Sequence, residues 1–186
     1  MTLPTKLFAF VILTIILITI SRPSLGSPRS HGFYRFFAWE SIVILFLLNV
    51  NIWFHQPLAW YQLVSWFFLF ASFVPLVYGV RTLVGRGKPV PHRETEPHLL
   101  AFEKTSELVT SGIYRYIRHP LYSSLLLLVW GIFFKSMNWH GFGIAAAASL
   151  FLFATARADE QECIRYFGPT YQTYMKQSKR FIPFLF

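Results

Sequence analysis

The chain has 186 residues, of which 54% are hydrophobic and 19% are aromatic. This composition indicates a membrane protein of one domain rather than a soluble one. The formal net charge of +9 does not indicate a nucleic-acid partner, because the cytoplasmic loops of membrane proteins collect lysine and arginine. The single cysteine, Cys163, excludes an internal disulfide, and we expect it to be a small buried or interfacial residue rather than a nucleophile.

Five apolar runs predict an all-α, polytopic membrane protein with about five transmembrane helices. The runs are residues 7–20, 37–54, 58–80, 121–134 and 139–156. The third run is long enough to cross a hydrocarbon core of about 30 Å, whereas the first and fourth need their flanking residues to complete the crossing. Gly141, Gly143 and the alanines at 145–148 predict close helix packing in the fifth run, because small residues let helix backbones approach in a bilayer.

The first apolar run has two interpretations. Lys6 precedes it and Ser24-Leu25-Gly26 follows it, as in a signal peptide with a weak cleavage site. We expect a retained helix instead, because one positive charge and the exit Ser21-Arg22-Pro23 do not make a strong cleavage signal.

The basic residues predict the orientation of the chain. Five spans place Lys6 and Lys135 on one side of the membrane and the other 15 of the 17 lysines and arginines on the opposite side. Because basic residues collect in the cytoplasm, we expect a multi-pass protein whose C-terminus and Arg118 lie on the cytoplasmic side. Cleavage of the first helix would invert this arrangement, which is a second reason to expect its retention.

The long connection over residues 81–116 contains Gly85-Arg86-Gly87-Lys88-Pro89, which predicts an irregular segment. Connections of about 35 residues are usually functional or disordered. Within this one, two histidines and two carboxylates occur between His92 and His98. These residues have neither helical spacing nor cysteines, so a solvated loop is the better interpretation and no metal is expected.

The most chemically distinctive segment precedes the fourth apolar run and ends in Arg118-His119-Pro120-Leu121-Tyr122. Proline suits the first position of a helix, so we expect a helix from Pro120, with His119 as the N-cap and Tyr122 in the first turn. The first backbone N–H groups of such a helix have no intrahelical partner and can face an anion. This segment is the best candidate for a functional site.

A second cluster, Asp159-Glu160, lies at the predicted end of the fifth span, on the same side of the membrane. Acidic groups at a helix C-terminus oppose the helix dipole and invite a cationic partner. A ligand that carries both a cation and an anion would fit between the two clusters. In the simpler interpretation Arg118 is an interfacial charge, His119 a cap, and the acids solvate a helix end.

The motifs together resemble a known superfamily. In order they are Leu108-Val109-Thr110-Ser111-Gly112-Ile113-Tyr114, Arg118-His119-Pro120-Leu121-Tyr122, Asp159-Glu160, Phe167-Gly168, Tyr171, Tyr174 and Arg180-Phe181-Ile182-Pro183. This order and spacing are similar to those of the isoprenylcysteine carboxyl methyltransferase and phospholipid methyltransferase superfamily of integral membrane enzymes. The resemblance covers about residues 80–186. It implies N-terminal transmembrane helices over residues 1–80 and a methyltransferase core over 81–186, within one structural domain.

The resemblance implies a methyltransferase that uses S-adenosylmethionine, with the cofactor pocket in the C-terminal half. The implied cofactor-binding residues are Gly112, Tyr114, Arg118, His119, Tyr122, Asp159 and Glu160. Of these, Gly112 and Tyr114 would shape the entry. Methyl transfer is a direct displacement at carbon, so the protein mainly aligns the reactants and excludes water. The implied acceptor is a lipophilic, lipid or prenylated molecule in the membrane.

Two positions depart from the family pattern. Asp159 stands where a Glu-Glu pair is usual, and Thr155 stands where relatives that methylate carboxylates carry an arginine. Arg157 does not replace that arginine, because two residues along a helix face nearly opposite sides. The acceptor therefore stays open among a prenylated cysteine carboxylate, a lipid amine, a small thiol and another lipophilic group.

Two other functions are compatible with the sequence. The first is a membrane reductase of the sterol reductase type, which has a similar C-terminal half and binds NADPH. The second is a non-catalytic membrane scaffold, for which Thr155 is the main argument. Retention of Arg118-His119-Pro120 favours the methyltransferase.

Overall fold

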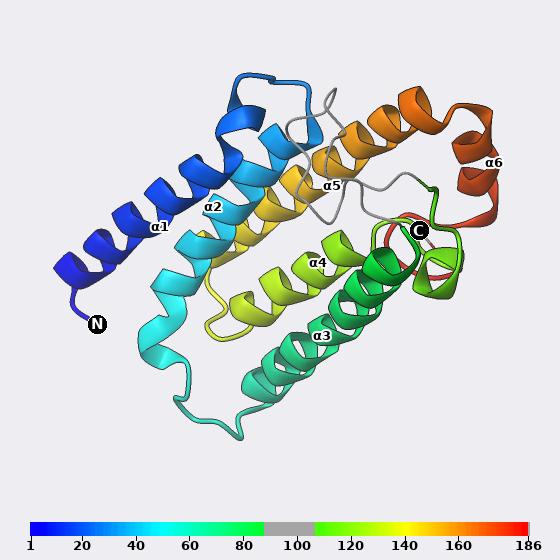
Figure 1. Ribbon diagram of the computed structural model, residues 1–186. Helices are drawn as coiled ribbons and strands as arrows, with labels where there is room; N and C mark the ends of the chain where they lie inside the picture. The colour runs from blue at the N-terminus through cyan, green and yellow to red at the C-terminus, as the bar shows by residue number, and fades with distance from the viewer. Residues whose placement is uncertain (88–106, 186) are drawn as a thin grey trace.

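The computed structural model of the protein describes residues 1–87 and 107–185, and the regular secondary structure in this part of the chain is entirely helical (Figure 1). The predicted all-α class is confirmed. In chain order the elements are α1 (Leu3–Leu25), α2 (His31–Asn49), the 3-10 helix η1 (Val50–Ile52), α3 (Trp60–Arg86), the 3-10 helix η2 (Gly112–Arg115), α4 (Pro120–Phe133), α5 (Trp139–Phe167) and α6 (Pro169–Gln177).

Four of the described helices are long and apolar enough to cross a membrane: α1, α2 with η1, α3 and α5. The fourth predicted span is also a helix, α4, but it has only 14 residues. At 1.5 Å per residue it is about 21 Å long, which is shorter than the hydrocarbon core. Four of the five predicted spans are therefore confirmed by length, and α4 is a shorter apolar helix within the same bundle.

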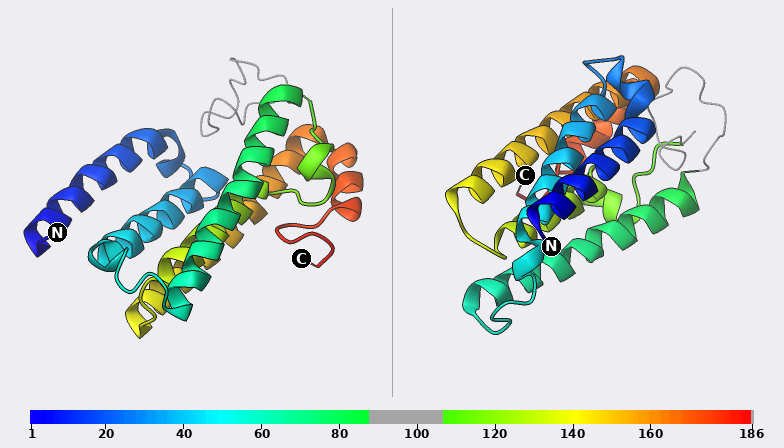
Figure 2. Two further views of the ribbon diagram at one scale, coloured as in Figure 1. Left: turned by 90° about the horizontal axis from the view of Figure 1, so that it is seen from below. Right: turned by 90° about the vertical axis from the view of Figure 1, so that its left-hand side faces the viewer.

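The short helix α4 lies at the centre of the bundle (Figures 1 and 2). It packs on α3, on α5 and on α2, while α2 packs extensively on α5 and α1 packs on α2. Ala145 and Ala148 of α5 are fully buried, as are Ala38 and Leu45 of α2. The small side chains of Ala38, Ala145 and Ala148 suit the close packing of α2 and α5. The predicted packing role therefore holds for Ala145 and Ala148 but not for Gly143, which is exposed and has open space where a Cβ would lie.

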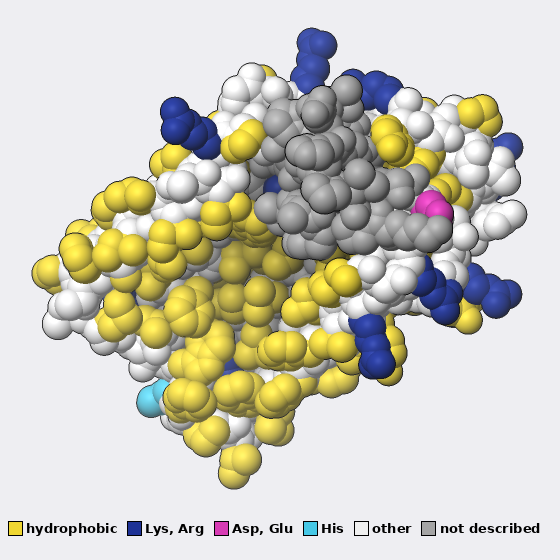
Figure 3. Space-filling model, viewed as in Figure 1, with side chains coloured by type: hydrophobic (Ala, Val, Ile, Leu, Met, Phe, Trp, Pro, Cys, Tyr) yellow, Lys and Arg dark blue, Asp and Glu magenta, His cyan; other side chains and the backbone are white. Residues whose placement is uncertain are grey.

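The outer surface of the helices is apolar. Large side chains such as Phe8, Phe67 and Leu150 are more than half exposed. Figure 3 shows hydrophobic side chains covering most of the face formed by the long helices, while most lysines and arginines in this view lie towards the end that holds α6 and the α1–α2 connection. This is the surface expected of helices that face hydrocarbon, with polar groups at the membrane boundary.

Two helix ends differ from the sequence-based expectation. Helix α3 continues to Arg86, so the first residues of the predicted irregular connection are helical. Helix α5 continues to Phe167, well beyond the predicted end at residue 156. Asp159 and Glu160 therefore lie inside α5, away from the last turn to which the unfavourable dipole interaction is confined. The cluster from His92 to His98 lies outside the described residues.

Candidate functional site

Helix α4 begins where the sequence predicts. Pro120 occupies its first turn and His119 is the N-cap residue, whose carbonyl oxygen accepts a hydrogen bond from the Ser123 N–H at 2.9 Å. The His119 side chain makes no capping hydrogen bond, so the predicted cap is correct in position but not in its bonding. Gly79 of α3 lies against this end, and a Cβ added to Gly79 would be 3.1 Å from Pro120 Cγ. The start of α4 is thus held against α3, and the imidazole is available for other contacts.

The C-terminal tail pairs with the backbone just before α4. The Arg118 N–H donates to the Lys179 carbonyl at 2.8 Å, and the Lys179 N–H donates to the Tyr116 carbonyl at 2.9 Å. The His119 N–H donates to the Arg180 carbonyl at 3.1 Å. This short parallel pairing brings Arg180 beside Arg118 and His119, although the two segments are about 60 residues apart.

The carboxylate of Glu160 lies at the centre of the site and is bound by three cationic side chains. Arg180 binds it with two nitrogens, Nε to Oε1 at 3.0 Å and Nη2 to Oε2 at 2.7 Å. Arg118 Nε donates to Oε1 at 3.0 Å, and His119 Nε2 lies 3.3 Å from the same oxygen. Glu160 is only 3% exposed. A buried carboxylate needs such partners, because an uncompensated charge away from water is costly.

Arg118 also fixes the segment that follows α6. Its Nη1 donates to the Met175 carbonyl at 3.1 Å and to the Ser178 carbonyl. Tyr174 of α6 donates its hydroxyl to the Tyr114 carbonyl at 2.6 Å. Burial is the main cause that raises the pKa of Tyr174, so this hydroxyl stays a neutral donor. Arg118 is therefore an organising residue of the site rather than a freely exposed interfacial charge.

His119 is buried between two carboxylates and an aromatic ring. Its Nδ1 lies 3.4 Å from Asp159 Oδ2, and its Nε2 faces Glu160. The imidazole stacks on Tyr122, with ring centres 5.4 Å apart. Burial lowers the pKa of His119, but the hydrogen bonds and charges of Asp159 and Glu160 outweigh it, so the pKa is above the ordinary value of 6.5. The structure thus favours a cationic imidazolium.

The raised pKa of His119 predicts a pH-dependent stability. Its contribution to the free energy of unfolding is fully present below about pH 6.5 and is lost as the pH rises through the higher pKa of the folded protein. The thermal unfolding midpoint in detergent should therefore fall over this window in the wild type, and should fall less in His119→Gln. Equal slopes in the two proteins would show that the imidazole is not charged in the folded state.

Comparison with known proteins identifies the segment that carries this cluster. Residues 96–170 match the family model described as phospholipid methyltransferase. This segment is similar to phospholipid methyltransferases. The resemblance to the membrane methyltransferase superfamily is therefore confirmed, and the match includes Arg118, His119, Asp159 and Glu160. No curated protein and no solved structure gives a significant match to the chain.

The structure brings five of the seven predicted site residues into one cluster. These are Arg118, His119, Tyr122, Asp159 and Glu160. Their binding of a cofactor stays a prediction.

Gly112 and Tyr114 lie in η2, shortly before Arg118. Gly112 has a φ of +62°, and a Cβ there would be 2.9 Å from Thr82 Oγ1 of α3. Only glycine adopts this conformation without strain and also fits so close to α3. Tyr114 is buried against α6. The two residues therefore fix the path of the segment that leads to Arg118.

The cluster also contains a residue outside the matched segment, Arg180. Arg180 stands in the C-terminal motif but is not among the residues predicted for the site. Its guanidinium binds both oxygens of Glu160 and lies over the ring of Phe153, 5.0 Å from the ring centre. The only sequence signal is the position of Arg180 in the C-terminal motif, because its partner on α5 is 20 residues away.

The predicted gap between the basic and acidic clusters is closed. Glu160 contacts Arg118, His119 and Arg180 directly, so both of its oxygens already have partners. Asp159 differs, because its side chain is 23% exposed. It contacts His119 and receives a 3.6 Å contact from Cys163 Sγ. Asp159 is therefore the carboxylate of the pair that can accept a further cation.

Thr155 and Arg157 lie on different sides of α5, as the sequence predicts. Thr155 is fully buried, and its hydroxyl donates to the Phe151 carbonyl of the same helix at 2.7 Å. Arg157 is exposed. At position 155, α5 thus presents a neutral, internally bonded side chain.

Proposed function

We propose that the protein is an S-adenosylmethionine-dependent methyltransferase that acts on a lipophilic acceptor within the membrane. The observation that carries this proposal is the buried cluster at the start of α4, where Arg118, His119, Asp159 and Glu160 come together. All four lie within the segment that matches the phospholipid methyltransferase family.

The donor set fits the amino-acid part of this cofactor, which carries an ammonium and a carboxylate. Asp159 is a partly exposed carboxylate suited to the ammonium. His119, with its pKa raised by two carboxylates, is a cation suited to an anionic or hydroxyl group. The aromatic ring of Tyr122 stacks beside it. When bound, S-adenosylmethionine supplies a methyl group activated by a sulfonium.

The side chains of this protein then act by binding and positioning. Direct displacement at carbon needs no covalent intermediate on the protein, so the site needs rigidity and dryness more than a nucleophile. Glu160 and its three cations provide a rigid, buried base for the pocket. Asp159 and His119 are the groups that we expect to contact the cofactor, and Glu160 is a positioning residue that holds His119.

For the acceptor we propose the amine of a phospholipid headgroup. The family description names phospholipids, and α5 carries the buried Thr155 in place of a carboxylate-binding arginine. An anionic acceptor such as a prenylated cysteine carboxylate would therefore lack its cationic partner on this helix. A neutral amine acceptor does not need one.

We also propose that the site faces the cytoplasm. Fifteen of the 17 lysines and arginines lie on the side assigned to it, and basic residues collect on the cytoplasmic side of membrane proteins. In sealed vesicles, methylation by added S-adenosylmethionine should then require an inside-out orientation.

A methyl-transfer assay with purified protein tests the proposed reaction. With methyl-labelled S-adenosylmethionine, label should enter phosphatidylethanolamine and not phosphatidylcholine, whose nitrogen already carries three methyl groups. Label in a prenylated cysteine instead would overturn the acceptor but keep the reaction. Calorimetry should show binding of S-adenosylhomocysteine and not of NADPH. Binding of NADPH alone would indicate the reductase, and binding of neither would indicate the scaffold.

A further inference from the structure

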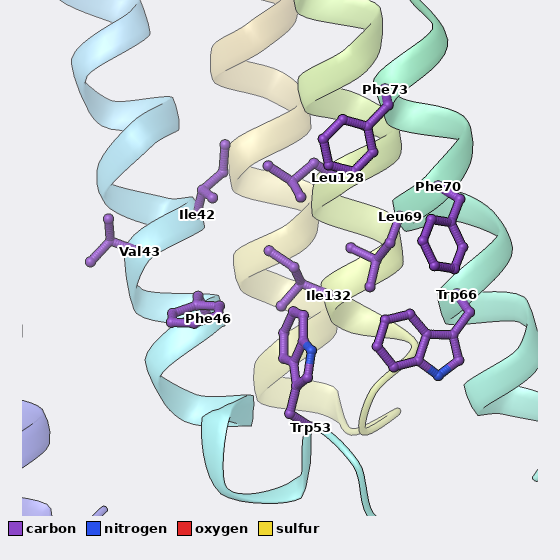
Figure 4. A pocket seen from close by; sticks show the side chains of 10 residues that line it. All are labelled: Ile42, Val43, Phe46, Trp53, Trp66, Leu69, Phe70, Phe73, Leu128 and Ile132. Carbon is purple, nitrogen blue, oxygen red and sulfur yellow. The ribbon is translucent and has the colours of Figure 1, made fainter. Parts of the chain in front are cut away.

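Two adjoining cavities lie at the end of the bundle opposite α6 and the Glu160 cluster. The first has a volume of about 380 Å³ and is lined only by apolar and aromatic side chains (Figure 4). Helix α2 forms one wall, α3 forms the other, and α4 lies between them. The lining residues are Ile42, Val43, Phe46, Trp53, Trp66, Leu69, Phe70, Phe73, Leu128 and Ile132.

The second cavity, of about 360 Å³, is polar and lies at the helix ends. Its walls are the segment before α3, the first turn of α3, and the turn between α4 and α5. His55, Tyr61, Gln62 and Lys135 are its main polar side chains.

Lys135 joins the two cavities. It lines the polar cavity, yet its Nζ lies 3.5 Å from the ring centre of Trp66 and 5.1 Å from that of Trp53. Both tryptophans line the apolar cavity. The two cavities therefore share the wall formed by Lys135 and the two indole rings. The polar cavity at the helix ends continues into the apolar cavity between the helices.

The partners of Lys135 in the described part of the chain are all neutral. Its Nζ donates to Gln62 Oε1 at 2.8 Å, and its other contacts are the two indole rings. Lys135 is only 1% exposed, and burial lowers its pKa to about 8, which leaves it protonated at pH 7. A buried ammonium without a counter-charge is unfavourable. A bound anion would supply the missing counter-charge. A small rotation of the flexible lysine side chain would bring the ammonium into contact with it.

We propose that the two cavities together bind one anionic phospholipid, from the leaflet opposite the Glu160 cluster. The phosphate of its headgroup lies at Lys135 and Gln62, and one acyl chain lies between α2 and α3. These two helices both pack on α4 but do not pack closely on each other, which leaves room for the chain. This site shares no residue with the proposed methyl-transfer site, so the two proposals stand or fall separately.

Native mass spectrometry of the full protein tests the proposal. The protein, released from detergent with equal amounts of phosphatidylglycerol and phosphatidylcholine, should retain phosphatidylglycerol preferentially. Lys135→Met should weaken this binding about tenfold or more, since a charge-assisted hydrogen bond is worth about one to two powers of ten in affinity. Lys6→Met is the matched control. Lys6 is the other lysine of the same end, it contacts the Leu48 carbonyl, and its loss should leave binding unchanged.

A second variant keeps the test decisive if Lys135→Met does not fold. Ile42→Trp places a bulky side chain in the apolar cavity, towards which Ile42 points (Figure 4), and leaves Lys135 intact, so it should reduce phosphatidylglycerol binding through the acyl chain. Retention of the lipid by either folded variant at the wild-type level would overturn the proposal. Binding of glycerol 3-phosphate as strong as that of phosphatidylglycerol would also overturn the proposal, because the acyl cavity would then have no role.

Discussion

The variant Glu160→Gln is expected to destabilise the protein by about 3–5 kcal/mol, the cost of removing one partner from a buried ion pair. In the wild type, one buried carboxylate holds Arg118, His119 and Arg180 together. Without its charge, three cationic groups face one another beside α5. The midpoint of thermal unfolding in detergent should drop markedly, and the loss should be greatest at low pH, where His119 is protonated.

A double-mutant cycle with Arg180 checks that the effect comes from these contacts. Arg180→Gln removes the bidentate partner of Glu160. The double variant should lose less stability than the sum of the two single variants, because the second substitution removes a cation that the first has left unpaired. Additive losses would mean that the ion pair contributes nothing to stability.

The contacts of Glu160 make its structural role hard to distinguish from a role in cofactor binding. Because Glu160 is the structural centre of the cluster, its variants lose activity even if Glu160 never touches a cofactor. The activity of Glu160→Gln therefore cannot assign a binding role. That role has to be tested at Asp159, which is more exposed and has fewer cationic partners.

Apolar run length and helix-start chemistry predicted most of the fold. The runs gave five helices, and Pro120 gave the start of α4. The end of α5 was not predicted, because the residues after position 156 are polar and the helix there is stabilised by long-range partners. Glu160 binds Arg118 and Arg180, while Glu162 binds His31 of α2. Hydropathy registers the polarity of such residues but not their partners.

The candidate site was predicted in its composition but not in its geometry. The sequence placed Arg118 and His119 on the same side of the membrane as Asp159 and Glu160, as two clusters with a gap for a ligand. The structure joins the clusters, because the C-terminal tail pairs its backbone with residues 116–119 and brings Arg180 to Glu160. A second contact of this kind, between His31 Nδ1 and Glu162 Oε2 at 2.6 Å, spans 131 residues. Local sequence patterns carry no information on pairings at such separations.

If Asp159 binds the cofactor ammonium, Asp159→Asn should weaken binding of S-adenosylhomocysteine about ten- to a hundredfold. A charge-assisted hydrogen bond contributes about 1.5–3 kcal/mol, and asparagine keeps the shape but not the charge. The unfolding midpoint should change much less than in Glu160→Gln, because Asp159 is partly exposed and, among the described residues, has His119 as its one charged partner.

Two control substitutions, one at the same position and one at a residue in contact with it, make this prediction specific. Asp159→Glu keeps the charge and restores the longer side chain usual in the superfamily, so it should retain affinity. Cys163→Ala removes the thiol that contacts Asp159 Oδ1 and should leave affinity nearly unchanged, since direct displacement gives the thiol no role. Isothermal calorimetry in detergent on the three variants decides the matter. Wild-type affinity in Asp159→Asn would show that the ammonium lies elsewhere. Equal losses in Asp159→Asn and Asp159→Glu would show that the position requires the length of aspartate as well as its charge.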